Sequence, residues 1–114
     1  MFKIEAIVRE EKYEEIKSVL NEIGVHGITV SQVMGCGMQK GYESIVRGTK
    51  VDINMLPKIK FEIVVSSQEW MDKTVKSITK TAFTGNIGDG KIFVYEILDA
   101  VRISTGQTGP EAIY

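Results

Sequence analysis

Hydrophobic and polar residues alternate in two segments of the chain, residues 2–8 (FKIEAIV) and residues 58–65 (KIKFEIVV). Alternation with a period of two is typical of a strand that has one buried and one exposed face. In the second segment, the odd-numbered residues from Ile59 to Val65 are apolar and share one face. The even-numbered residues, from Lys58 to Val64, share the other. The pattern therefore predicts two half-buried strands.

Two other segments have helical spacing. Apolar residues between Tyr13 and Ile23 recur every three or four positions, which predicts a helix over residues 11–23. Gly24 follows where a helix often ends in a left-handed glycine. Ser66 and Glu69 have the spacing of a capping box, and we expect a second helix from there to residue 82 or 83.

The remaining pattern predicts strands at residues 26–34 and 91–96 and a short strand at residues 100–104. Residues 36–55 have no visible period and predict a long loop, which Leu56-Pro57 ends. Loops of that length in a compact domain are usually functional or disordered. The tail, residues 105–114, is expected to be irregular.

The order strand–helix–strand occurs twice, and residues 3–8 (KIEAIV) resemble residues 60–65 (KFEIVV). This predicts a single α+β domain over residues 1–114, a ferredoxin-like double βαβ sandwich with a long loop between its halves. Two helices would cover one face of the sheet. Ile7 and Val64 would lie on the uncovered face, which predicts oligomerisation.

Composition argues against several classes of function. The net charge is −1 and the pI is near 5.8, so no basic field is available for nucleic acid. An RNA-binding sheet would also need aromatic residues on its open face, whereas Phe61 points to the helices. No apolar run is long enough to span a membrane. The single cysteine, Cys36, excludes an internal disulfide and indicates a reducing cytoplasm.

Glycines gather in two places, residues 35–41 (GCGMQKG) and residues 84–94 (TGNIGDGKIFV). The second resembles a P-loop, but residue 92 is Ile rather than Ser or Thr and a strand follows instead of a helix. Each segment alone is more typical of a tight turn than of a binding site. Together with Lys58, Lys91 and Arg102, which alternation places near one sheet face, their bare amides favour a polyphosphate site.

No nucleophile or metal site is evident. His26 has no Cys, Asp or His at metal-ligand spacing, and Cys36 has no base partner in the pattern. We therefore expect a binding protein and not an enzyme; a nucleotide-handling enzyme remains an alternative.

These motifs, in this order, resemble the PII nitrogen-regulatory family. Residues 84–94 are similar to its signature, residues 35–41 to the base of its T-loop and residues 56–58 (LPK) to the T-loop exit. Residues 101–106 (VRISTG) and 111–113 (EAI) are similar to its closing segment. The resemblance implies a cytoplasmic homotrimer with a T-loop at residues 37–55 and ATP or ADP bound between subunits. The implied nucleotide contacts are Thr29, Gly37, Met38, Gln39, Glu62, Val64, Gly88, Asp89, Gly90, Lys91 and Arg102.

The resemblance also implies a second effector, 2-oxoglutarate, beside ATP, with Gln39 coordinating Mg²⁺ and Lys58 pairing with a carboxylate. The implied 2-oxoglutarate contacts are Gly37, Gln39, Lys40, Gly41 and Lys58. The implied target is an ammonium transporter reached through Arg47, with glutamine synthetase or nitrogenase as other possible targets. Met38 and Ser104 stand where many members have arginine. This leaves open a related sensor of adenine nucleotides that does not respond to 2-oxoglutarate.

Overall fold

A computed structural model describes residues 1–36, 43–46, 49–52 and 55–113, and within residues 43–52 it describes the backbone alone. Its main sheet has four antiparallel strands in the order β2-β5-β1-β6. They are β1 (Phe2–Arg9), β2 (Ile28–Cys36), β5 (Met55–Val65) and β6 (Gly90–Glu96). This is the order expected for two interlocked βαβ units, so the predicted ferredoxin-like fold is confirmed.

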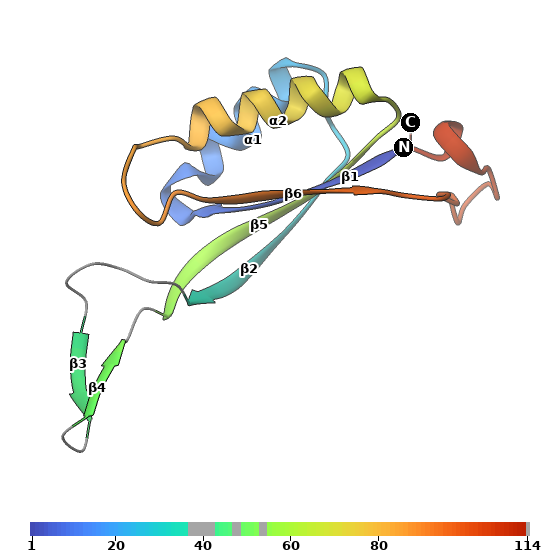
Figure 1. Cartoon of the computed structure of the whole chain (residues 1–114). Coiled ribbons are helices and arrows are strands. Elements are labelled where there is room, and N and C mark those ends of the chain that lie inside the picture. The colour runs from blue at the N-terminus through green and yellow to red at the C-terminus, as the bar shows by residue number, and fades with distance from the viewer. Residues whose placement is uncertain (37–42, 47–48, 53–54, 114) are drawn as a thin grey trace.

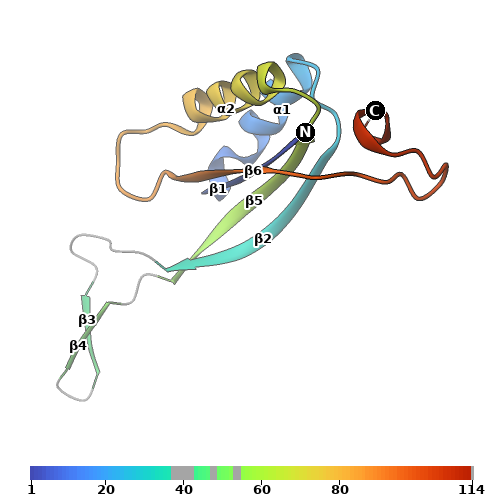
Figure 2. The ribbon, with the colours of Figure 1, turned by 45° about the vertical axis from the view of Figure 1, so that its right-hand side comes forward.

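Two helices, α1 (Tyr13–Glu22) and α2 (Gln68–Ala82), lie side by side on one face of the sheet (Figure 1). A 3₁₀ turn, Glu10–Lys12, leads into α1, and Gly24 follows the helix with a φ of 94°. That left-handed conformation is accessible to glycine without steric cost, as the sequence predicted for this end. Neither α1 nor α2 lies on the other face of the sheet, which Figure 2 shows from a second angle.

The core lies between the helices and the sheet, where alternate residues of β1 and β5 are buried as predicted. Phe61 is completely buried and stacks on Tyr13, with 5.8 Å between ring centroids. Ile16, Leu20 and Ile78 bring the apolar faces of both helices onto it. Each fully buried side chain of this size contributes about 1.5–3 kcal/mol of hydrophobic stabilisation.

The prediction of an irregular loop over residues 36–55 is wrong at three places. β2 continues to Cys36, β5 already begins at Met55, and β3 (Glu43–Val46) pairs with β4 (Thr49–Asp52) as a small antiparallel sheet. Pro57 is therefore inside a strand. It is tolerated because β5 pairs there with Met34 of β2, while β1 ends opposite Lys58. The N–H that proline lacks is not needed on the unpaired side.

Other boundaries of helices and strands also differ from the prediction. The N-cap of α2 is Ser67, whose hydroxyl accepts a 3.2 Å hydrogen bond from the amide of Trp70, and not Ser66. The predicted strand at residues 100–104 is reduced to an isolated bridge between Val101 and Thr108. Within the tail, residues Gly109–Ala112 form a 3₁₀ turn. Among the helices of the described residues, none is long and apolar enough to cross a membrane.

Candidate functional site

The glycine-rich loop between α2 and β6 is organised around the carboxylate of Asp89. This carboxylate accepts hydrogen bonds from the amides of Thr84 and Gly85, at 2.8 and 3.0 Å, and from the Thr84 hydroxyl. Arg9 adds a fourth donor at 3.1 Å. The hydrogen bonds from Thr84, followed by those from Gly85 and Arg9, hold the pKa of Asp89 well below its usual range. The side chain is therefore a fixed anion that closes the loop onto itself.

Cations gather beside this loop at one end of the open sheet face. Arg9 and Lys58 are paired residues of β1 and β5, and Lys91 pairs with Ile7. The ammonium of Lys58 donates a 2.7 Å hydrogen bond to the carbonyl of Gly88. Burial lowers the pKa of Lys58, and the neighbouring Arg9 guanidinium lowers it further. An anionic ligand at this position would relieve the repulsion between the two cations.

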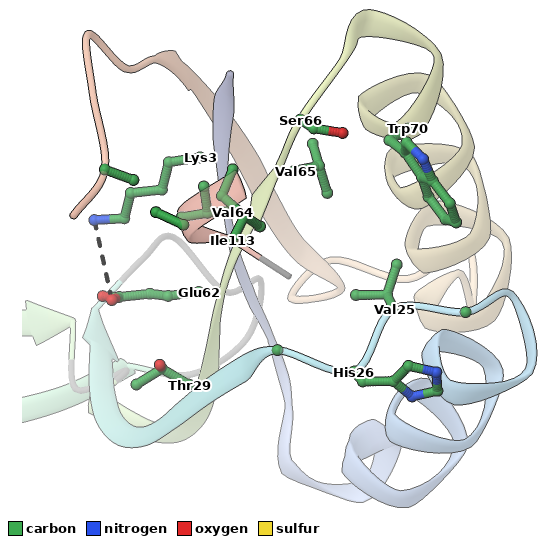
Figure 3. A pocket seen from close by; sticks show the side chains of 14 residues that line it. Lys3, Val25, His26, Thr29, Glu62, Val64, Val65, Ser66, Trp70 and Ile113 are labelled. Carbon is green, nitrogen blue, oxygen red and sulfur yellow. Dashed lines mark ion pairs between the residues drawn. The ribbon is translucent and has the colours of Figure 1, made fainter. Parts of the chain in front are cut away.

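A pocket of about 760 Å³ lies at the opposite end of the sheet (Figure 3). Glu62 and Val64 of β5 line it together with Thr29 of β2, so three of the predicted nucleotide contacts do come together. Glu62 forms ion pairs with Lys3 at 4.0 Å and with Lys60 at 3.4 Å. The wall is completed by Lys3, Gly24, Val25, His26, Gly27, Val65, Ser66, Trp70, Ala100, Ala112 and Ile113.

Arg102 lies beside this pocket rather than beside the glycine loop. Its Nε donates a 3.4 Å hydrogen bond to the carbonyl of Ala112, a residue of the pocket wall. It is not in a strand, so the prediction that alternation places it on the open face is wrong. The tail folds back here because the amide of Gly109 donates to both Asp99 and Ala100, at 2.9 and 3.1 Å.

The predicted site residues therefore form two clusters. The loop cluster contains Gly88, Asp89, Gly90 and Lys91 with Lys58, and the pocket cluster contains Thr29, Glu62, Val64 and Arg102. Along β5, Glu62 lies four residues and Val64 six residues from Lys58, which corresponds to about 13 and 20 Å. Within one chain, the structure does not bring the two clusters together.

Several predicted contacts lie outside the described residues, so the structure does not place them. Among the residues whose side chains are described, no three His, Cys, Asp or Glu side chains gather where they could hold a metal ion. The predicted contacts that are not placed are Gly37, Met38, Gln39, Lys40, Gly41 and Arg47.

Three residues that contribute to these clusters were not among the predicted site residues. Arg9 joins the loop cluster because it continues the alternation of β1 by one residue past the predicted end. Trp70 and His26, which the sequence pattern did not assign to a ligand site, both line the pocket. His26 lies 3.0 Å from the side-chain oxygen of Asn21. A useful signal was the pair of glycines beside His26: Gly24 and Gly27 both line the pocket, and a Cβ on Gly27 would meet no atom within 4 Å.

Known proteins resemble the chain over nearly its whole length. The model of the family described as "Nitrogen regulatory protein P-II" matches residues 1–107. "Nitrogen regulatory protein P-II 1" of Methanothermobacter thermautotrophicus is 48% identical over 113 residues, covering 99% of this chain and 97% of that protein. The P-II protein of Rhizobium etli is 50% identical over 108 residues, covering 95% and 96%.

Solved structures agree with this result. A complex of Bacillus subtilis GlnK with ATP is 40% identical and superposes with a TM-score of 0.78, covering 97% of this chain and 95% of that one. A second structure of the same GlnK is 43% identical, with a TM-score of 0.80 and coverage of 97% and 96%. The relatives are named as regulators of nitrogen metabolism, which are signalling proteins and not enzymes, as predicted. The chain belongs to the P-II nitrogen regulatory protein family.

Proposed function

We propose that this protein is a homotrimeric sensor of ATP, ADP and 2-oxoglutarate that controls nitrogen-assimilation targets through the conformation of residues 37–55. The observation that carries this proposal is the division of the predicted nucleotide contacts between two ends of one sheet face. A neighbouring copy that places its loop cluster against this chain's pocket would complete a single site. The complex of Bacillus subtilis GlnK with ATP supports the choice of ligand.

Apolar exposure in the single chain supports assembly. Leu98 and Ile103 are fully exposed, at 102% and 99%, and Val101 is 62% exposed. Neighbouring apolar side chains that stay in water indicate an interaction surface. Ile7 and Val64, half-buried on the open sheet face, would be covered by the same assembly.

Each cluster suits one part of a nucleotide. In the pocket, Thr29 and the backbone of Val64 would contact adenine, and Glu62 the ribose. In the loop cluster, the amides of residues 88–90 and the ammonium of Lys91 would bind the phosphates. The backbone of residues 37–39 would join them, together with Arg102 of the copy that supplies the pocket. Fixed amides and charged donors bind such anions more strongly than neutral pairs bind each other.

The second effector would bind beside the phosphates. Lys58 would pair with one carboxylate of 2-oxoglutarate, and the amides of Gly37, Lys40 and Gly41 with the rest. Mg²⁺ takes few protein ligands and relies on phosphates; Gln39 is the proposed protein ligand. Because the two effectors would share the ion, each would raise the affinity for the other equally, with a coupling free energy of about 1–3 kcal/mol.

The proposed target is an ammonium transporter contacted by Arg47 from the cytoplasm, with glutamine synthetase and nitrogenase as further possible targets. Arg47→Ala should abolish co-sedimentation with membranes that contain the transporter, whereas Lys50→Ala, which removes a nearby cation of the same segment, should not. Equal loss in both variants would indicate general charge attraction rather than contact by Arg47.

Calorimetric titration tests the ligands. ATP, ADP and AMP are each titrated with and without Mg²⁺ and 2-oxoglutarate. We expect 2-oxoglutarate to bind only when ATP and Mg²⁺ are present, and we expect no sustained ATP hydrolysis. Equal affinity for 2-oxoglutarate without ATP would contradict the shared site, and steady rapid hydrolysis would contradict the sensor.

A mixing experiment tests the division of the site between copies. Lys91→Met removes a cation of the loop cluster, and Arg102→Met removes one of the pocket cluster. Each homotrimer should bind ATP weakly. After the two variants are unfolded and refolded together in equal amounts, about one quarter of the sites should combine two intact halves and regain wild-type affinity. Absence of recovery in verified mixed trimers would place both halves of the site on one chain.

Met38 and Ser104 support a second candidate, a sensor of carbon or energy state that reads adenine nucleotides without 2-oxoglutarate. Arginine at these positions would add two cations near the phosphates. The same titration separates the candidates, since the second predicts nucleotide binding that 2-oxoglutarate does not change. Met38→Arg and Ser104→Arg should then strengthen ATP binding more than AMP binding.

A further inference from the structure

Two cations of the sheet, Arg9 and Lys58, form hydrogen bonds with the glycine-rich loop between α2 and β6, called the glycine loop below. Arg9, at the end of β1, donates through its Nη2 to the carbonyl of Ile87 at 2.9 Å, in addition to its bond with Asp89. Lys58 of β5 donates to the next carbonyl, that of Gly88. The side chain of Arg9 is 19% exposed, and its other ion-pair partner, Glu11, is largely in water. Two consecutive carbonyls of the loop are thus directed at fixed positive charges.

This arrangement determines where the following amides point. In a planar trans peptide unit, the C=O and the N–H are directed to opposite sides. Because the carbonyl of Ile87 faces Arg9, the amide of Gly88 faces away from Arg9. By the same rule, the amide of Asp89 faces away from Lys58. Both are among the amides proposed above to bind phosphate.

Without these contacts the carbonyls of Ile87 and Gly88 would lose the side-chain donors that fix them, and the two peptide units beside Gly88 could turn. Gly88 has a φ of 104°, in a region that glycine enters readily. A glycine between two peptide units allows either unit to rotate, which would direct a carbonyl oxygen rather than an amide towards an anion. A Cβ on Gly88 would lie 3.3 Å from Nη2 of Arg9, so the guanidinium packs directly under this residue.

We propose that Arg9 is a positioning residue for phosphate binding, which acts by holding the carbonyl of Ile87 and the carboxylate of Asp89 so that the amide of Gly88 stays directed at the phosphoryl groups of the ligand. Lys58 does the same for the amide of Asp89. This rests on the nucleotide function proposed above. Arg9 needs no contact with the ligand, and its planar guanidinium reaches two acceptors at once, which a lysine ammonium cannot do with the same fixed geometry.

Three variants test the role of Arg9. Arg9→Met removes both contacts, Arg9→Lys keeps the charge without the two-pronged geometry, and Lys12→Met is the matched control. Lys12 is a cation three residues away that pairs with Glu15, and among the described residues it forms no hydrogen bond or ion pair with the loop. Amide hydrogen exchange and ¹⁵N chemical shifts of Gly88 and Asp89 are recorded on the full chain without ligand. ATP affinity is then measured by calorimetry and adenosine affinity by NMR titration.

We expect Arg9→Met to change the exchange and shift of the Gly88 amide and to weaken ATP binding about tenfold, with adenosine affinity changed less than about twofold. Arg9→Lys should fall between Arg9→Met and the wild type, and Lys12→Met should match the wild type. Unchanged Gly88 and Asp89 amides in Arg9→Met would overturn the proposal. So would a wild-type result for Arg9→Lys, or an equal loss in Lys12→Met, since either would show that charge alone matters. If wild-type protein binds no ATP, the proposed function fails, while the amide measurements still decide the role of Arg9.

Discussion

Among the glycines that the structure describes, Gly90 has the least room for a side chain. It has a φ of 108°, and a Cβ built on it would lie 1.8 Å from the carbonyl oxygen of Ile7 in β1. Real Cβ atoms essentially never come closer than 3.0 Å to such an atom. Gly90→Ala therefore requires the backbones of β1 and β6 to separate by about 1.2 Å, the difference between 1.8 and 3.0 Å. We predict that this substitution is strongly destabilising.

Two effects contribute to the loss of stability expected for Gly90→Ala. A left-handed φ costs a residue with a Cβ about 1–2 kcal/mol. Separating the strands also disrupts the pairs Val8–Gly90 and Ile7–Lys91 at the start of β6, and each backbone hydrogen bond contributes about 1 kcal/mol. The free energy of unfolding should therefore fall by about 3–4 kcal/mol. That is a large share of the ~5–15 kcal/mol typical of a domain.

Urea denaturation at a fixed protein concentration measures this loss, because the stability of an oligomer depends on concentration. Gly88→Ala is the matched variant. Its φ of 104° is nearly the same, but its Cβ would lie 3.3 Å from the Arg9 guanidinium, a side-chain contact, instead of 1.8 Å from backbone. Gly27→Ala, with no atom within 4 Å, should change stability by less than about 0.5 kcal/mol. If Gly90→Ala costs no more than Gly88→Ala, the clash with Ile7 is not the cause and the reasoning fails.

Ser67→Ala should lower the free energy of unfolding by about 1 kcal/mol, because it removes the cap on the amide of Trp70. Ser67→Asp should retain the cap. Equal urea midpoints for the two variants would refute the capping role of Ser67. Phe61→Ala should cost about 3–5 kcal/mol in the same assay, since Phe61 is fully buried, whereas Phe83→Ala, at a side chain 69% exposed, should cost less than about 1 kcal/mol. Because the pKa of Asp89 is depressed in the folded state, its carboxylate contributes stability above its unfolded pKa of about 3.9 and loses that contribution as the pH falls further. Thermal unfolding between pH 7 and 3 should show this loss in the wild type and not in Asp89→Asn; parallel pH profiles would contradict it.

Much of the fold could be predicted because β1 and β5 alternate cleanly and both helices have clear apolar spacing. The errors occur where the local signal is short or duplicated. β3 and β4 have four residues each, too few for a period to emerge, although Gly48 between them is a turn signal. Ser66 and Ser67 both suit a helix start, and only the hydrogen bond to Trp70 distinguishes them. The bridge at Val101 is short because a strand needs a partner, and among the described residues only Thr108 pairs with it.

The composition of the site was more predictable than its geometry. Strand alternation indicated that Lys58 and Val64 share a face, which is correct. Alternation does not show how far apart two residues of the same face lie along the strand. Arg102 was grouped with Lys58 for the same reason, and the structure places it beside Ala112 at the other end. Arg9 was missed because a cation at the end of a strand is usually a solvated charge, and its role depends on a loop about 80 residues later in the chain.

The separation of the two clusters has a thermodynamic consequence for a sensor of this design. If each site needs the loop cluster of one copy and the pocket of another, a bound nucleotide contacts two chains at once. A ligand that binds the assembled form and not the separate chains stabilises the assembly by mass action. By the same linkage, changes at the interface alter nucleotide affinity even without touching a ligand contact. In that assembly, the exposed side chains of Leu98 and Ile103 would belong to the proposed sensing mechanism as much as Lys91 would, if their burial forms the surface on which the two halves meet.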